Sequence, residues 1–82
     1  MKNLNHKSLF DFNNKMVLIT GASGQIGSSL AKLFLELGST VFGFDLWRGN
    51  QKHNNYNFVK VDVTNKNLVK KKIAQIINNK KK

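Results

Sequence analysis

Three glycines at regular spacing, Gly21, Gly24 and Gly27, are the residues of this chain best suited to bind a ligand. They follow a short apolar run that ends in Thr20, and they precede a stretch with helical periodicity. Glycine lets a backbone approach a phosphate closely, where a side chain would collide. The start of the following helix adds free N–H groups and a positive dipole end. The pattern therefore predicts a site for the pyrophosphate of a dinucleotide.

An acidic residue strengthens this prediction, since Asp45 ends the next apolar run, 18 residues after Gly27 (45 − 27). A carboxylate about 20 residues beyond the glycines typically accepts hydrogen bonds from the adenosine ribose hydroxyls. It would also repel a 2′-phosphate, so the expected cofactor is NAD rather than NADP. Arg48 leaves alternatives open, because its guanidinium could bind a 2′-phosphate, stack on adenine or point to solvent.

The hydrophobic pattern predicts the elements that hold these residues in place. Met16–Ile19 and Thr40–Phe44 have the short apolar composition of buried strands, and Asn57–Val61 is expected to form a third. A helix from about Gln25 is expected to bury one apolar face and to end at a left-handed Gly38. The face predicted to be buried comprises Ile26, Leu30, Leu33, Phe34 and Leu37.

The rest of the chain is expected to add a loop and a second helix. Residues 46–56 are polar and lack helical periodicity, which predicts a loop. Thr64 is expected to cap the last helix, whose apolar face comprises Val69, Ile73, Ile76 and Ile77. The order β-α-β-loop-β-α predicts an α/β fold, a partial Rossmann-like three-layer arrangement of three parallel strands with flanking helices.

This order divides the chain into three parts. Residues 1–14 are expected to be an irregular lead-in, and residues 80–82 a basic tail. Residues 15–79 are expected to form the N-terminal half of a dinucleotide-binding Rossmann domain. In the lead-in, three apolar residues could anchor against the core, namely Leu9, Phe10 and Phe12.

Composition narrows the classes of function. The 82 residues include no cysteine and only two separated histidines, so a disulfide framework is excluded and no cluster of metal ligands is visible. The net charge of +10 comes almost wholly from Lys, and no aromatic residue lies among the Lys runs. We therefore do not expect nucleic-acid binding. No apolar run could span a bilayer and no secretory signal is visible, so we expect no membrane partner and a cytoplasmic location.

The sequence G-x-x-G-x-x-G preceded by Thr20 resembles the short-chain dehydrogenase/reductase family. The resemblance begins at Leu9-Phe10-Asp11-Phe12, continues through the glycine turn and Asp45, and extends to Val61-Asp62-Val63-Thr64. It implies that Asp62 contacts the adenine amino group and that Val63 lies near the ring. It also implies that the pyrophosphate is met by Ser23, Gln25 and Ile26. The glycine spacing is nearer to that of the family's extended, epimerase-like members.

The resemblance also calls for a catalytic Tyr and Lys one helical turn apart, and Tyr56 and Lys60 have that spacing. They fall in and beside a predicted strand, where four residues span about 13 Å, so we reject the pair and predict no catalytic residue. The expected function is the NAD(P)-binding segment of a short-chain dehydrogenase/reductase-like oxidoreductase whose catalytic half is absent from this chain. The alternatives are a non-catalytic dinucleotide-sensing or partner-binding module, and a segment of a nucleotide-sugar epimerase or dehydratase.

The first strand is expected to lie at an edge of the sheet, because no further strand follows the last helix to pair with it. An unpaired apolar edge favours association with another polypeptide. Besides the dinucleotide, the expected partner is therefore a complementing second half or a further copy in a homo-oligomer.

Overall fold

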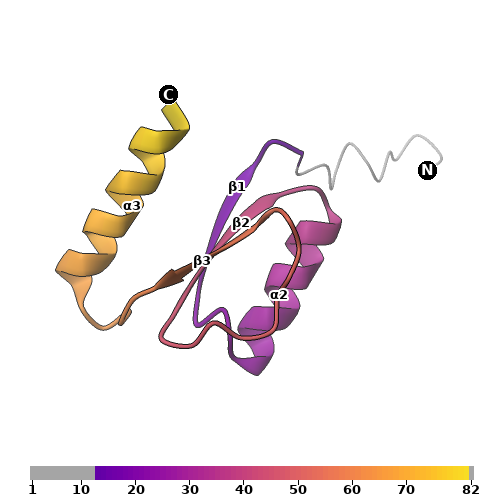
Figure 1. Cartoon of the computed structure of the whole chain (residues 1–82), viewed down its shortest axis with the longest axis horizontal. Helices are drawn as coiled ribbons and strands as arrows, with labels where there is room; N and C mark the ends of the chain where they lie inside the picture. The colour runs from indigo at the N-terminus through magenta and orange to yellow at the C-terminus, as the bar shows by residue number, and fades with distance from the viewer. Residues whose placement is uncertain (1–12, 82) are drawn as a thin grey trace, which may run out of the picture.

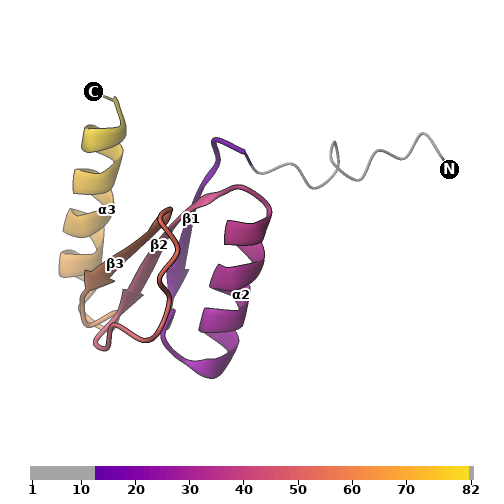
Figure 2. The same cartoon turned by 45° about the vertical axis from the view of Figure 1, so that its right-hand side comes forward.

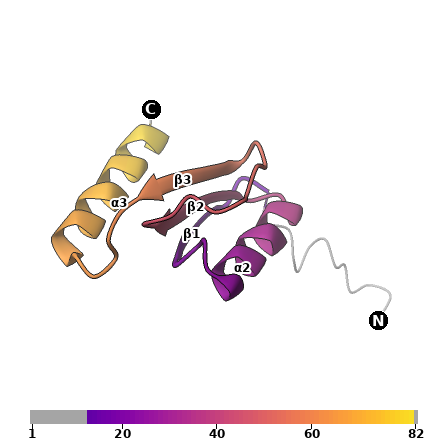
Figure 3. The same cartoon turned by 60° about the horizontal axis from the view of Figure 1, so that its bottom comes forward.

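The computed structural model describes residues 13–81, which form a parallel three-stranded sheet with a helix on each side (Figure 1). In spatial order the strands are β1 (Met16–Thr20), β2 (Thr40–Asp45) and β3 (Tyr56–Lys60). The helices are α2 (Gln25–Glu36) and α3 (Lys66–Lys81). They lie on opposite sides of the sheet (Figures 2 and 3). The predicted partial Rossmann-like α/β fold is confirmed. The proposed anchors Leu9, Phe10 and Phe12 lie outside the described residues.

The strand register places the carboxyl ends of all three strands at one edge of the sheet. Thr20 lies beside Phe44, and Asp45 lies beside Lys60. The third strand begins at Tyr56, one residue before the predicted start, so the loop spans residues 46–55. Within residues 13–81, β1 pairs with β2 alone, and its outer edge is unpaired as expected.

The face of α2 that packs on the sheet differs from the predicted one. The buried residues of the helix are Gly27, Ala31 and Leu35, with Phe34 half-buried against the same core. Three residues of the predicted face are instead exposed, with exposed fractions of 77% for Ile26, 43% for Leu30 and 47% for Leu33. That prediction was therefore wrong for most of the face.

Gly27 explains the rotation of α2. A Cβ on this residue would lie 2.0 Å from the Gly21 carbonyl oxygen, so the helix can begin against the turn only because residue 27 is a glycine. Side chains four and eight positions later lie on the same helix face. Once Gly27 faces the turn, Ala31 and Leu35 must face the sheet.

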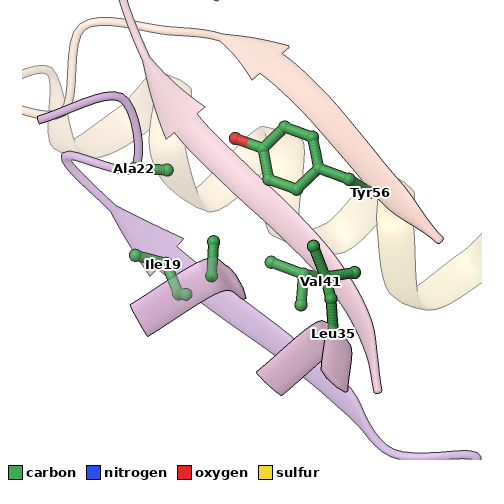
Figure 4. Close-up of a cluster of buried hydrophobic side chains, with 6 residues drawn as sticks. Ile19, Ala22, Leu35, Val41 and Tyr56 are labelled. Atoms are coloured by element: carbon green, nitrogen blue, oxygen red, sulfur yellow. The ribbon is translucent and has the colours of Figure 1, made fainter. Parts of the chain in front are cut away.

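The core between α2 and the sheet is completed by strand residues (Figure 4). The Tyr56 ring lies across β2 with its hydroxyl directed toward Ala22. Gly43 provides the space, because a Cβ at that position would overlap the Tyr56 hydroxyl. Burial in this core raises the pKa of Tyr56 above its ordinary value of 10.0. Tyr56 is thus a packing residue of the sheet.

The other face of the sheet buries Phe44, with Val61 just beyond the end of β3 also buried. The predicted apolar face of α3 is half-buried at Val69, Ile73 and Ile76, whereas Ile77 is exposed. The predicted cap is wrong by one residue. Asn65 caps α3, since its side-chain oxygen accepts the Leu68 N–H at 3.1 Å. Thr64 is instead engaged by Asp62, which accepts both its N–H and its hydroxyl.

Candidate functional site

The turn between β1 and α2 is held against the end of β2 by backbone bonds. The Gly21 N–H donates to the Phe44 carbonyl at 2.8 Å, and the Gly24 N–H donates back to the Gly21 carbonyl at 3.1 Å. Gly21 has φ +68°, in the left-handed region that favours glycine. The chain therefore reverses at the carboxyl edge of the sheet, and α2 begins there.

The N-terminus of α2 has no side-chain cap. Gly24 occupies the cap position, and the first turn contains no acidic residue. The first N–H groups of a helix have no partner within it, so these are available to an external acceptor. The contrast with α3, which Asn65 caps, is informative. An uncapped, glycine-lined helix start is suited to a phosphate group.

Asp45 lies at the end of β2 with its carboxylate bonded to the turn. Oδ2 accepts the Ser23 N–H at 3.0 Å, and Oδ1 accepts the Leu46 N–H at 2.7 Å. These bonds, that from Ser23 first, hold the pKa of Asp45 below its ordinary value of 3.8. Asp45 is therefore an anion at neutral pH. Each carboxylate oxygen has a second lone pair, so the group can still accept a ligand hydroxyl.

Asp62 and Val63 follow the end of β3 at the same edge. The Val61 N–H donates to the Asp45 carbonyl at 3.0 Å, which keeps this segment beside the end of β2. Asp62 Oδ1 accepts the Thr64 hydroxyl at 2.6 Å and the Thr64 N–H at 2.9 Å, and these two bonds lower the pKa of Asp62. Val63 is 40% exposed. Both predicted adenine contacts are thus open to solvent.

Loop 46–55 contributes contacts that the sequence pattern did not predict. The Ser23 hydroxyl donates to the Trp47 carbonyl, and Gln51 Nε2 donates to the Ser28 carbonyl at 3.1 Å. Together the loop and α2 enclose a polar depression of about 260 Å³, lined chiefly by Ser23, Ser28, Ser29, Lys32, Asn50 and Gln51. Both bonded acceptors are backbone carbonyls, which every residue possesses. No residue type could therefore have revealed these contacts.

Arg48 lies against the aromatic rings of β3. Its guanidinium carbon is 5.8 Å from the centre of the Tyr56 ring and 5.7 Å from that of the Phe58 ring. Such distances are typical of cation–π contacts. Arg48 therefore stacks on rings of its own chain, and its role toward a ligand stays open.

The Tyr56 and Lys60 pair does not form a catalytic dyad in the structure. Tyr56 is only 7% exposed, and burial raises its pKa by more than the nearby Arg48 lowers it, whereas a catalytic tyrosine needs a lowered pKa. Lys60 lies at the exposed far end of β3. The rejection of this pair as catalytic stays a prediction.

The structure brings most of the predicted binding residues together. The glycine turn, Ser23 and Asp45 are joined by hydrogen bonds, while Gln25 and Ile26 lie on the exposed first turn of α2. Residues 13–81 contain no group of three side chains that could hold a metal ion. Neither described helix combines the length and the apolar character needed to cross a membrane.

Comparison with known proteins points to dinucleotide enzymes. A sequence model of the NAD-dependent epimerase/dehydratase family matches residues 17–78. An uncharacterized oxidoreductase of Schizosaccharomyces pombe is 35% identical over 63 residues, which cover 77% of this chain and 24% of that protein. A short-chain dehydrogenase of Leptospira borgpetersenii with bound NAD+ superposes with a TM-score of 0.79 and 32% identity, over 94% of this chain and 30% of that one. The Bordetella bronchiseptica enzyme WbmH in complex with NAD+ superposes with a TM-score of 0.67 and 38% identity, over 77% of this chain and 23% of that one.

The chain therefore spans only about a quarter to a third of the length of these relatives. The matched region includes the glycine turn, Asp45 and Asp62. The similarity thus falls on the part of the molecule where the uncapped helix and the bonded carboxylate lie.

Proposed function

Because the chain belongs to the NAD-dependent epimerase/dehydratase family and has the Rossmann fold of short-chain dehydrogenases, we propose that its glycine turn binds the adenosine-pyrophosphate half of NAD. The family predicted from the glycine spacing is confirmed. The observation that carries the proposal is the uncapped start of α2 beside the ionised Asp45. The N-terminus of α2 would attract the phosphates, and the Asp45 carboxylate would accept hydrogen bonds from the hydroxyl groups of a neighbouring ribose.

The proposed roles follow from this geometry. The N–H groups of Gln25, Ile26 and Gly27 donate to the pyrophosphate, and Gly24 leaves room for it. Asp45 binds the adenosine ribose. The Ser23 side chain keeps the neighbouring loop in place through its bond to the Trp47 carbonyl. The adenine amino group and ring are assigned to Asp62 and Val63, respectively.

We further propose that the dinucleotide is NAD rather than NADP. Asp45 is held in its charged form by two backbone N–H groups, and a 2′-phosphate on the ribose would be repelled by it. Arg48 supports the same choice, because its guanidinium stacks on Tyr56 and Phe58. To bind a 2′-phosphate it would have to leave both rings.

The reaction of the whole protein is proposed from the family. The chain would serve as the cofactor-binding segment of an oxidoreductase acting on a carbonyl or alcohol, or of an enzyme acting on a nucleotide sugar. The match to the epimerase/dehydratase family favours the second substrate class, and the dehydrogenase neighbours favour the first. A complementing polypeptide or a further copy of the chain is the proposed macromolecular partner.

Trp47, the single tryptophan, provides the assay for cofactor binding, because it is 76% exposed and its carbonyl is bonded to Ser23. Titration with NAD+ should change its fluorescence, with weaker binding of NADP+. Asp45→Ala should weaken NAD+ binding by roughly 10- to 150-fold, since a hydrogen bond to a charged group contributes about 1.5–3 kcal/mol. Gly21→Val should weaken it as well, because valine is strained at a positive φ.

Glu36→Gln is the matched control, since it removes an acidic charge at the other end of α2. It should leave NAD+ binding unchanged, and far-UV circular dichroism should show that all three variants are folded. Undiminished NAD+ binding in both site variants would sink the assignment of the site. Equal affinity for NAD+ and NADP+ would refute the proposed preference alone.

A further inference from the structure

Loop 46–55 takes the place of a crossover helix between β2 and β3. Parallel strands are usually joined by a helix, but here the loop lies on the α2 side of the sheet, where a hydrogen bond from Gln51 joins it to that helix (Figure 2). Tyr56 and Phe58, two residues apart on β3, face the same side. The guanidinium of Arg48, the single arginine of the sequence, lies against both rings.

The backbone that carries Arg48 lies beside the proposed ribose site. On one side of Arg48, the Trp47 carbonyl accepts the Ser23 hydroxyl. On the other side, a Cβ on Gly49 would lie 2.9 Å from Ser23 Oγ. The Ser23 N–H donates in turn to Asp45. The Arg48 side chain therefore begins next to the carboxylate that would bind the ribose, and its charged end is directed away to β3.

We propose that the rings of Phe58 and Tyr56 act as specificity determinants, because they hold Arg48 away from the position that the 2′-phosphate of NADP would occupy. This inference rests on the proposed function of the glycine turn. A planar guanidinium can bind a phosphate with two parallel hydrogen bonds. Its methylene stem gives the charged end the freedom to lie on the rings or at the ribose. The two positions exclude each other, so the ring contact competes with NADP.

The contact with the rings lowers the affinity for NADP alone. A binding group that is available in only a fraction of the molecules reduces the apparent affinity by that fraction. A cation–π contact at an exposed site corresponds to a change of about twofold to fivefold in an equilibrium constant. NAD has no 2′-phosphate, so its affinity does not depend on where Arg48 lies. The effect adds to the repulsion of the same phosphate by Asp45.

A double-mutant cycle between Phe58 and Arg48 tests the proposal, with the ratio of NADP+ to NAD+ affinity measured by Trp47 fluorescence. Phe58→Leu keeps an apolar side chain but removes the ring, and it should raise this ratio by about twofold to fivefold. Phe58→Tyr, the matched control, keeps a ring and should leave the ratio unchanged. Arg48→Ala should change the ratio by less than about twofold in the parent chain. In the Phe58→Leu chain it should remove the whole gain.

Tyr56, the single tyrosine, reports the position of Arg48 without any cofactor. Burial raises the pKa of Tyr56, and the nearby Arg48 cation lowers it in part. Absorbance titration of the phenol should therefore show ionisation at a higher pH in Arg48→Ala than in the parent chain. Phe58→Leu should shift the titration in the same direction, because the guanidinium leaves the rings. Circular dichroism should show that these variants are folded.

The outcomes separate this inference from the proposed function. A chain that binds NAD+ with a ratio unchanged by Phe58→Leu would overturn the inference alone. So would a gain that survives Arg48→Ala, or a Tyr56 titration that Arg48→Ala leaves unmoved. Binding of neither dinucleotide would refute the proposed function and the inference with it. Arg48→Ala decides the matter even where Phe58→Leu does not fold, because a severalfold loss of NADP+ affinity would show that the guanidinium already binds the phosphate.

Discussion

Gly27→Ala is the substitution whose cost the structure defines most directly. The added Cβ would lie 2.0 Å from the Gly21 carbonyl oxygen and 2.9 Å from the Ala22 Cα. Ordinary contact begins near 3.4 Å, so α2 must move by roughly 1.4 Å (3.4 − 2.0) away from the turn. These are backbone atoms, which cannot rotate aside as a side chain can. We expect a loss of about 3 kcal/mol in unfolding free energy, at the upper end of overpacking costs.

For a domain of this size that loss lowers the midpoint of thermal unfolding by roughly 12–24 °C, to be measured by circular dichroism. Gly24→Ala is the control. Its Cβ would lie 3.4 Å from the same carbonyl oxygen, and its φ of −76° suits any residue. Its free energy of unfolding should therefore lie within about 0.5 kcal/mol of that of the parent chain.

The two variants separate folding from cofactor binding. The methyl group of Gly24→Ala would occupy the start of α2, where we propose that the pyrophosphate binds, so Trp47 fluorescence should show weaker NAD+ binding by a folded chain. A Gly27→Ala chain as stable as the parent would refute the close-approach argument. A Gly24→Ala chain that binds NAD+ undiminished would refute the phosphate site.

Four further variants test the carboxylate, the cap and the tyrosine. The folded-state pKa of Asp45 is lowered, so the stability it contributes is complete above 3.8 and is lost as the pH falls through the folded value. As the pH falls below 4, the free energy of unfolding measured in urea should therefore decrease more for the parent chain than for Asp45→Asn. Parallel profiles of unfolding free energy against pH would contradict this. Asn65→Ala should cost about 1 kcal/mol in urea unfolding, more than Thr64→Ala; the reverse order would restore Thr64 as the cap. The chain should turn over no carbonyl substrate, and activity abolished by Tyr56→Phe would overturn our rejection of that residue.

The order of elements could be predicted because each strand and helix has its own periodicity and is bounded by a turn residue. The end of α2 is an example, since Gly38 has the expected positive φ of 97°. The rotation of α2 could not be predicted, because its apolar residues cover more than one side of the helix. The contact of Gly27 with the Gly21 carbonyl decides which side is buried, and that contact exists only in the folded chain.

The cap of α3 shows a similar limit. Thr64 and Asn65 are adjacent, and both residue types cap helices well. Asp62 decides between them, because its Oδ1 accepts both donors of Thr64 and leaves Asn65 to accept the Leu68 N–H. The family resemblance indicated Asp62 only as a candidate contact for adenine. Its hydrogen bonds to Thr64 depend on the path of the chain after β3.

Asp45 links the order of the turn to the proposed choice of cofactor. The sequence indicated this residue by its spacing from the glycines, and the structure adds that its carboxylate already accepts the Ser23 and Leu46 N–H groups. These donors come from two segments that meet at the edge of the sheet, so the negative charge is stabilised by the same contacts that hold the turn against β2. A binding group positioned in this way needs little reorganisation when a ribose arrives. The same fixed charge would oppose a 2′-phosphate, so a substitution of Asp45 that reversed the proposed preference for NAD would also remove the two hydrogen bonds that support the turn.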